Sequence, residues 1–287
     1  MQKEIIVPKI IFIIPYRDRL EQKFFFKQYM THIMEDYSKE DYEIYFSHQT
    51  DNREFNRGGT KNIGFLAMKN KYPNHYKNIT FVFNDIDTIP HKKNIIDYKT
   101  NSGTIKHFYG FKYALGGIFS ITGEDFEKLN GFPNYWGWGF EDNSINNRAM
   151  VNKLTIDRST FWHIGNKNII QLFDSCARSI LVENKKRYIS DSKKKDYSDG
   201  LSTITNLNYN INNDMINIKT FDCKTTYNPD NISDVNFFTT QKNNMFKMKN
   251  ANLNQGNPTT MNNDKNKKVI TTTKTKPLNN KSRFKMF

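Results

Sequence analysis

Apolar runs alternate with helical patterns through the first 90 residues, and this alternation limits the possible folds more than any other feature. Residues 10–14 and 79–83 are nearly continuous apolar runs and residues 42–47 alternate in polarity, so all three are predicted strands. Helical spacing at residues 21–34 and 57–71 separates them. This order predicts an α/β fold with a mostly parallel central sheet flanked by helices. In such a sheet, ligands bind at the carboxyl ends of the strands.

The pattern changes after Pro90. Residues 115–121 form a predicted strand entered through Gly116 and Gly117, and Thr122 is a predicted helix N-cap. Helices are also expected at residues 141–152 and 175–187. We expect a catalytic domain, an extension of unassigned structure and a low-complexity basic tail, at residues 1–210, 211–240 and 241–287.

The net charge of +14 is concentrated at the C-terminus. Residues 241–287 contain ten Lys and one Arg against one Asp. This composition predicts a disordered, solvated tail whose charge alone could hold nucleic acid or an acidic membrane. We expect no specific nucleic-acid partner, because the tail has few aromatic residues and no recognisable domain.

The chain shows no membrane-anchor pattern. The apolar run at residues 10–14 is far shorter than the roughly 20 residues that span a bilayer, and no small-residue cleavage site follows it. Cys176 and Cys223 form no disulfide framework or metal-site spacing. We therefore expect a soluble, cytoplasmic protein.

Asp85 and Asp87 follow the third predicted strand directly. Side chains two residues apart on an extended chain point the same way, so the two carboxylates can converge on one hard cation, Mn²⁺ or Mg²⁺. Short acidic motifs are common by chance, and a solvated turn is the alternative. Basic residues follow the first strand at Arg17 and Arg19 and open the second helix at Arg57, where they can meet phosphate.

Residues 136–142 (WGWGFED) combine tryptophan, glycine and carboxylates. An exposed indole face is a good platform for a sugar ring. Asp142 lies in the first turn of the next helix, where the helix dipole favours the ionised form that a general base needs. Acidic residues also occur at helix starts without any catalytic role, and position alone favours that alternative.

Taken together, these motifs resemble the β-1,4-galactosyltransferase family in order and spacing over residues 8–165. The matching segments are residues 15–19 (PYRDR), 55–57 (FNR), 83–90 (FNDIDTIP), 116–117 (GG) and 131–142 (GFPNYWGWGFED), with a weaker match at 198–201 (SDGL). The resemblance implies a GT-A fold, a UDP-sugar donor, Mn²⁺ and inversion at the anomeric carbon.

The resemblance also assigns roles residue by residue. It implies donor binding by Pro15, Tyr16, Arg17, Arg19, Phe55, Arg57, Asp85 and Gly117, acceptor binding by Trp138, Gly139, Glu141 and Asp142, catalysis by Asp142 as the base, and metal ligation by Asp87 and His163. His163 lies about twenty residues after Asp142, and neutral imidazole is a common metal ligand. The positions of a further family ligand hold Thr160 and Gly165, so water is expected to complete the shell.

Two departures concern the substrates. The family's usual run of carboxylates becomes Glu141-Asp142-Asn143-Ser144, which changes contacts to the acceptor. Ala114 stands where the family often has a Tyr, and the smaller side chain leaves room for an N-acetyl group on the donor sugar. UDP-GalNAc and UDP-GlcNAc therefore join UDP-galactose as candidate donors.

The predicted function is an inverting, Mn²⁺-dependent glycosyltransferase, with Mg²⁺ as the alternative metal. It would move a hexose or N-acetylhexosamine from a UDP-sugar to a hydroxyl of a glycan or glycoconjugate. Two alternatives remain open: a metal-dependent nucleotidyltransferase, which would not need residues 136–142, and a non-catalytic glycan-binding protein.

Overall fold

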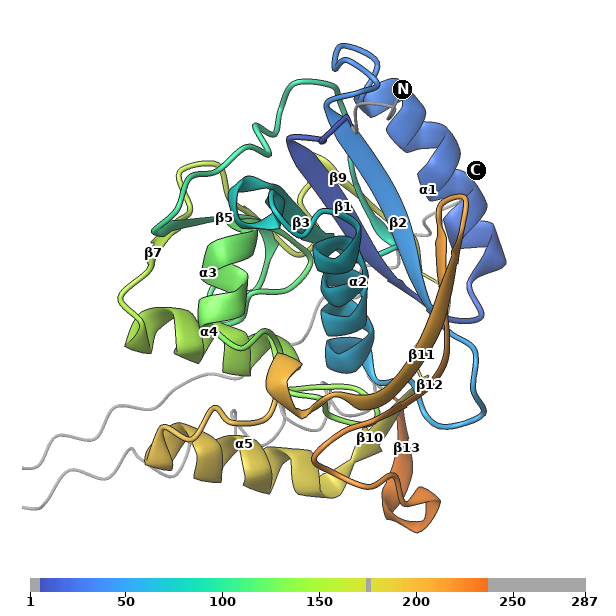
Figure 1. The fold of residues 1–287 in the computed structure, drawn as a ribbon, viewed down its shortest axis with the longest axis vertical. Coiled ribbons are helices and arrows are strands. Elements are labelled where there is room, and N and C mark those ends of the chain that lie inside the picture. Colours follow the sequence, from blue (N-terminus) through green and yellow to red (C-terminus); the bar gives the residue numbers. More distant parts are fainter. Residues whose placement is uncertain (1–5, 174–176, 237–287) are drawn as a thin grey trace, which may run out of the picture. The chain divides into compact units, whose positions relative to one another are not determined.

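The computed structural model describes residues 6–173 and 177–236, which form a central sheet with helices packed on both of its faces (Figure 1). The helices are α1 (Leu20–Ile33), α2 (Arg57–Lys71), α3 (Gly123–Lys128), α4 (Glu141–Val151) and α5 (Val182–Lys194). The strands are β1 (Ile10–Tyr16), β2 (Tyr42–Gln49), β3 (Thr80–Asn84), β4 (Thr88–Pro90), β5 (Thr104–Gly110), β6 (Ile118–Thr122), β7 (Thr155–Asp157), β8 (Trp162–His163), β9 (Ile169–Gln171), β10 (Ala177–Leu181), β11 (Thr205–Asn212), β12 (Met215–Asp222) and β13 (Ile232–Asn236). Short 3₁₀ turns lie at Tyr76–Asn78, Leu201–Thr203 and Pro229–Asn231.

The main sheet has the strand order β11-β12-β2-β1-β3-β6-β5-β7, and β8 pairs with β5 beside this path. The pairs β12–β2, β2–β1, β1–β3, β5–β7 and β5–β8 are parallel. Strand β6 runs antiparallel to both β3 and β5. The structure thus confirms a mostly parallel α/β sheet.

Side chains of β1 alternate between two hydrophobic cores, one on each face of the sheet. Ile11 and Ile13 belong to the core that also contains residues of α2, whereas Phe12 and Ile14 belong to the core that contains residues of α1. A strand with apolar side chains on both faces reads as a continuous apolar run, which is why residues 10–14 stood out in the sequence. The crossover helices therefore cover opposite faces.

Helix α1 buries a different stripe from the one its aromatic residues suggested. Phe26 and Met30 are fully buried, whereas Phe24 is 67% exposed. By sequence spacing alone, Phe24, Phe25, Gln28 and Tyr29 fall near one face of the helix. The residues that pack on the sheet instead follow the spacing 22, 26, 30 and 33.

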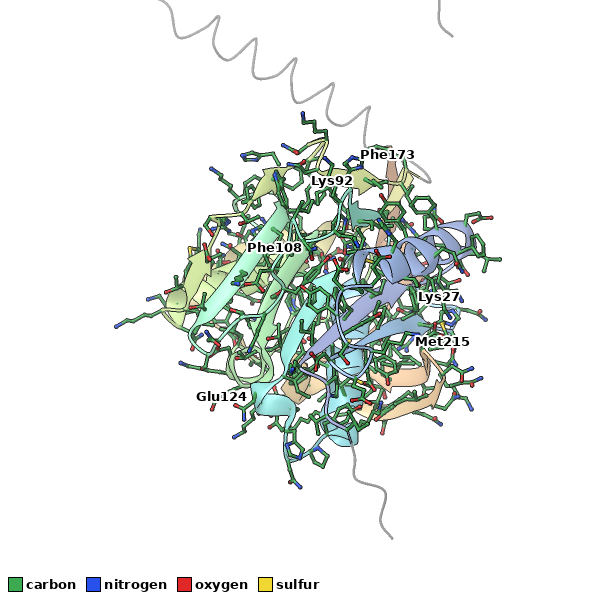
Figure 2. The ribbon with its side chains drawn as sticks, turned by 90° about the horizontal axis from the view of Figure 1, so that it is seen from above. Lys27, Lys92, Phe108, Glu124, Phe173 and Met215 are labelled. Atoms are coloured by element: carbon green, nitrogen blue, oxygen red, sulfur yellow. The ribbon has the colours of Figure 1, made fainter. Side chains whose placement is uncertain are left out.

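The main sheet extends past residue 210 through the β11–β12 hairpin. Met215–Ile218 of β12 pair in parallel with Phe46–Gln49 of β2. Lys27 of α1 lies close to Met215 (Figure 2) and forms an ion pair with Asp214 at 2.6 Å. Residues from the predicted extension are thus part of the sheet that carries the site.

The predicted helix at residues 175–187 is wrong in its first half. Residues 174–176 lie outside the described part of the chain, Ala177–Leu181 form β10, and the helix begins at Val182. Strand β10 pairs antiparallel with β13, more than fifty residues later in the chain. Local spacing carries no information about such a distant partner, so the helical pattern was extended too far towards the N-terminus.

The basic tail at residues 241–287 lies outside the described residues. Across residues 6–173 and 177–236, no helix is long and apolar enough to cross a membrane.

Candidate active site

Asp85 follows the last residue of β3 and is fixed by the backbone of the neighbouring glycine loop. Its N–H donates to the carbonyl of Gly117 at 2.9 Å. The side chain of Asn84 donates to the carbonyls of Asp85 and Thr88, at 2.7 and 2.8 Å, and closes the turn. The Asp85 carboxylate is therefore held at the carboxyl end of a buried parallel strand, where ligands bind in α/β sheets.

Arg57 connects two carboxylates that lie far apart in the sequence. Its Nη2 donates to Asp85 Oδ1 at 2.8 Å, and its Nε donates to Glu141 Oε1 at 2.9 Å. The side chain of Asn56 caps α2 by accepting from the Gly59 N–H at 2.8 Å, which fixes Arg57 as the first residue of the helix. Arg57 thus joins the end of β3 to the start of α4.

The surrounding cations set the charge state of Asp85. Burial alone would raise the pKa of this carboxyl, but Arg57, Lys61 and Arg19 outweigh burial and hold the pKa below its usual range. Burial likewise opposes the charge of Arg57, and Asp85 and Glu141 outweigh it, so the pKa of Arg57 is raised. Asp85 is therefore an anion at neutral pH.

Asp142 lies in the first turn of α4, against a glycine that leaves room for its carboxylate. A Cβ on Gly116 would come within 2.4 Å of Asp142 Oδ2, so only glycine fits this close approach. The Leu115 N–H donates to the Asp142 carbonyl at 2.9 Å, and Lys61 Nζ donates to Asp142 Oδ1 at 2.9 Å. The base predicted from the sequence is thus held from two sides.

Burial raises the pKa of Asp142 to about 7, and the Glu141 and Asp85 carboxylates add to the rise against the opposing charges of Lys61 and Arg57. The helix dipole was expected to favour the ionised form. Burial and like charges win here, because their effect at a partly buried carboxyl exceeds that of a helix end. A carboxylate with a pKa near 7 is well suited to accept a proton at neutral pH.

The two tryptophans of the loop before α4 have different environments. Trp136 is 1% exposed, stacks on Phe221 at 5.5 Å and donates its ring N–H to the Thr225 carbonyl at 2.8 Å. Trp138 is partly exposed, and its backbone N–H donates to Ser179 at 2.7 Å. Gly139 has φ +114°, and a Cβ there would meet nothing within 4 Å. Trp136 is therefore a core residue, whereas Trp138 and Gly139 lie where a ligand can reach them.

The loop before α4 is held in place by hydrogen bonds to Asp199, which lies in the weakly matching segment 198–201. Asp199 is 3% exposed and accepts from the backbone N–H of Asn134 at 3.0 Å and from its side chain at 3.1 Å. Arg148 of α4 donates to the carbonyls of Gly131 and Asp199. This segment supports the loop from the core.

The remaining predicted donor residues lie around the ends of β1 and β2. Tyr16 is 7% exposed and packs edge-on against His48 at 4.8 Å, so its ring belongs largely to the core, as does Pro15. Arg17 donates to the Arg53 carbonyl, and Arg19 Nη1 lies 3.3 Å from Asp87 Oδ2. Phe55 is partly exposed beside Arg57. The structure thus brings Arg19 to Asp87 and Arg57 to Asp85.

Asp87 and His163 differ in how well they are placed for a metal. Asp87 is partly buried in the turn between β3 and β4, and its carboxylate is a donor suited to Mn²⁺. His163 is exposed on β8, which pairs with β5 at Gly110. Within the described residues, no group of three or more His, Cys, Asp or Glu side chains is placed to hold a metal ion. Carboxylate and imidazole are both donor types that divalent metals accept, and a complete shell would need further donors.

Lys61 is the site residue that the sequence reasoning missed. It is 1% exposed, lies one helical turn after Arg57, and also approaches Asp85 Oδ1 at 3.8 Å. The spacing of Arg57 and Lys61 could have indicated that Lys61 reaches the site, because residues four apart share one helix face. That face points at the carboxyl ends of the strands.

Two solved structures of a Drosophila galactosyltransferase share this fold. The catalytic domain of Drosophila β-1,4-galactosyltransferase 7, solved with xylobiose, matches 76% of this chain and 96% of its own length, at a TM-score of 0.58 and 22% identity. A mutant of the same enzyme, solved with manganese, UDP-Gal and xylobiose, has a TM-score of 0.58 and 21% identity over the same shares of each chain. The architecture is therefore that of a GT-A glycosyltransferase catalytic domain.

Comparisons of the sequence also find galactosyltransferases. Residues 5–99 match the N-terminal region of glycosyl transferase group 7, and residues 100–171 match the family described as the N-terminal domain of galactosyltransferase. β-1,4-Galactosyltransferase 4 of Mus musculus is 32% identical over 162 residues, which are 52% of this chain and 45% of that protein. β-1,4-Galactosyltransferase 1 of Homo sapiens is 30% identical over 210 residues, 69% of this chain and 50% of that protein.

The xylosylprotein 4-β-galactosyltransferase of Caenorhabditis elegans is 28% identical over 208 residues, 68% of this chain and 70% of that protein. The chain spans about half the length of the Mus musculus and Homo sapiens relatives. Two adjacent family matches together run through residues 5–171. The chain belongs to glycosyltransferase group 7, the family of the β-1,4-galactosyltransferases.

Proposed function

We propose that the protein is an inverting glycosyltransferase that moves a hexose or N-acetylhexosamine from a UDP-sugar to a hydroxyl of a glycan acceptor. The observation that carries the proposal is Asp142, a carboxyl with a pKa of about 7 that lies between Gly116 and Lys61 and close to the ion pair of Arg57 with Asp85. A proton acceptor tuned to neutral pH beside a cation-rich strand end suits deprotonation of a hydroxyl next to a diphosphate.

In the proposed reaction, Asp142 takes the proton of the acceptor hydroxyl as its oxygen attacks the anomeric carbon. The bond from that carbon to the UDP oxygen breaks on the opposite face, and UDP leaves with the electron pair. Arg17 and Arg19 lie at the end of β1, where they can add positive charge near the diphosphate. Trp138 and Gly139 offer a surface for the acceptor sugar.

We further propose that Asp87 and His163 hold a divalent metal, Mn²⁺ or Mg²⁺, with phosphate oxygens and water completing its shell. Such an ion would neutralise charge on the departing UDP. Arg19 lies 3.3 Å from Asp87 in the protein alone, so it would move from the carboxylate towards phosphate when metal and donor bind. The manganese and UDP-Gal bound to the Drosophila relative support a divalent metal at a UDP-sugar site in this chain.

The donor sugar is proposed from Ala114, which is 6% exposed and directly precedes Leu115 of the glycine loop. A small side chain at this position suits a donor with an N-acetyl group. We therefore include UDP-GalNAc and UDP-GlcNAc with UDP-galactose as candidate donors.

A nucleotide-sugar panel tests the proposal. The full chain is incubated with each of the three UDP-sugars, with Mn²⁺, Mg²⁺ or a chelator, and with xylosides, glucosides and N-acetylhexosaminides as acceptors. We expect metal-dependent UDP release and a new glycosidic product of inverted configuration for at least one pair. A nucleotide adduct in place of free UDP would identify a nucleotidyltransferase, and glycan binding without UDP release would identify a non-catalytic binder.

A further inference from the structure

A lysine is buried beneath the proposed base. Lys61 of α2 is 1% exposed, and lysine is almost never fully buried unless its charge is paired. Its Nζ lies 2.9 Å from Asp142 Oδ1, 3.8 Å from Asp85 Oδ1 and 4.6 Å from the centre of the Phe132 ring. The ammonium group thus lies between the two carboxylates to which we assign different tasks.

The residues on either side of Lys61 have structural hydrogen bonds, but Lys61 does not share their partners. Thr60 donates to the Asn56 carbonyl at 2.7 Å within α2, and Asn62 donates to the Phe132 carbonyl at 2.7 Å. Lys61 instead reaches Asp142, 81 residues later in the chain. A buried ion pair that served stability alone could be replaced as a whole by apolar side chains of similar volume with little loss. The presence of Lys61 next to the base therefore suggests a catalytic reason.

We propose that Lys61 is a positioning residue for Asp142, holding its carboxylate against Gly116 and favouring the ionised, proton-accepting form. This role in catalysis rests on the glycosyl transfer proposed above. The electrostatic effect on Asp142 follows from the contact and can be measured without any substrate.

The charges that face Asp142 come from three elements. Lys61 and Arg57 of α2 favour the anion, whereas Asp85 after β3 and Glu141 of α4 disfavour it. The loop before β6 contributes Gly116 and the backbone of Leu115, which carry no charge. With Lys61 present, the pKa of Asp142 is about 7. Removing this nearest cation leaves burial and two carboxylates less opposed, so the pKa rises further.

The direction of the expected change in activity follows from the proposed role of Asp142 as the base. Asp142 works when ionised, so the rate increases as the pH rises through its pKa. An adjacent opposite charge shifts a carboxyl pKa by about one to three pH units. Lys61→Met, which removes the charge and keeps most of the length of the side chain, should move the titration midpoint of Asp142 up by at least about one unit. The ionised fraction at pH 7, and with it the turnover number, should then fall at least about fivefold, with little change in the KM for the donor.

The test uses the full chain labelled with ¹³C at the Asp carboxyl carbons and the Lys Cε, with Asp142→Asn and Lys61→Met to assign the two signals. Asp142 is titrated by NMR in the wild type, Lys61→Met, Lys61→Arg and Lys69→Met. Lys69→Met is the matched control, because Lys69 lies on the same helix and pairs with Glu127 instead. We expect an upward shift for Lys61→Met, a midpoint close to that of the wild type for Lys61→Arg, and no change for Lys69→Met.

A folded Lys61→Met variant with an unchanged Asp142 midpoint overturns the proposal. If neither Lys61→Met nor the second variant Lys61→Gln folds, the NMR titration of the wild type alone tests the proposal. Its Lys61 Cε signal must then shift with the same midpoint as the Asp142 carboxyl, and its failure to do so rejects the contact. If no donor releases UDP from the wild type, the proposed function fails while the titration still tests Lys61.

Discussion

The end of β3 and the start of α4 each present a carboxylate to the same lysine, yet the two groups have opposite charge behaviour. Asp85 is surrounded by Arg57, Lys61 and Arg19, and its pKa is held low. Asp142 lies next to Glu141 and Asp85, and burial raises its pKa to about 7. Their exposed side-chain fractions are similar, 18% and 21%. The difference therefore comes from neighbouring charges more than from burial.

This contrast separates two roles. A group that remains an anion across neutral pH can hold a donor or order nearby cations, whereas a group that titrates near neutral pH can accept and release a proton. Two carboxyls whose surroundings push their pKa values apart are a common mark of divided catalytic roles. The proposed assignments of Asp85 to the donor and Asp142 to the base follow this division.

The largest expected effect comes from Asp142→Asn, which removes the proton acceptor and keeps the shape of the side chain. The turnover number should fall by about 10²- to 10⁴-fold, the range that general base catalysis contributes. Binding of UDP with Mn²⁺, measured by calorimetry, should remain close to that of the wild type. Near-normal turnover of the folded variant would remove Asp142 as the base.

Arg57→Met tests the link between the two regions. The change leaves Asp85 and Glu141 without the cation they share, and breaking a buried pair costs about 3–5 kcal/mol in the free energy of unfolding. Urea denaturation measures this loss. The control is Lys9→Met, which breaks the exposed ion pair to Asp41 and should cost less than about 1 kcal/mol. Equal losses in the two variants would mean that the Arg57 pairs do not hold the regions together.

Gly116→Ala tests the fit between the glycine loop and the base. The added methyl group would come within 2.4 Å of Asp142 Oδ2 and push the carboxylate aside. A displacement of about 1 Å can reduce catalysis about 10²-fold, so we expect a loss of this size in turnover, with a similar melting temperature. Unchanged turnover would show that the position of Asp142 against this loop is unimportant.

Ala114→Tyr is expected to have the smallest effect, because it changes donor choice and leaves the base in place. A larger side chain should favour UDP-galactose over the N-acetylated donors by about tenfold, within the range expected for a small change of shape in a pocket. The ratio of kcat/KM for the donors measures this. Tyr113→Phe, an exposed neighbour, is the control and should leave the ratio unchanged. A preference for UDP-galactose already in the wild type would contradict the assignment to Ala114.

The fold was predictable from the sequence where a helix or strand leaves a local pattern of apolar residues, or where a strand is buried on both faces. β1 and β3 are buried on both faces, so both read as apolar runs, and the prediction of α2 at residues 57–71 is confirmed. The predicted N-cap at Thr122 is also confirmed, since its side chain accepts from the Asp125 N–H. Strand β10 was not predictable, because its partner β13 lies far along the chain. A strand with a distant partner leaves no local periodicity that separates it from a helix start.

By itself, the sequence determined the order of strands and helices, the set of charged residues at the strand ends, and the family. These follow from side-chain periodicity and motif spacing, which are properties of the chain read locally. Only the tertiary structure decided that Trp136 is a core residue, that Arg57 joins Asp85 to Glu141, and that Lys61 lies beneath Asp142. It also reversed the expected effect at Asp142. Its pKa depends on burial and on charges contributed by α2, the end of β3 and α4, which come together only when the chain folds.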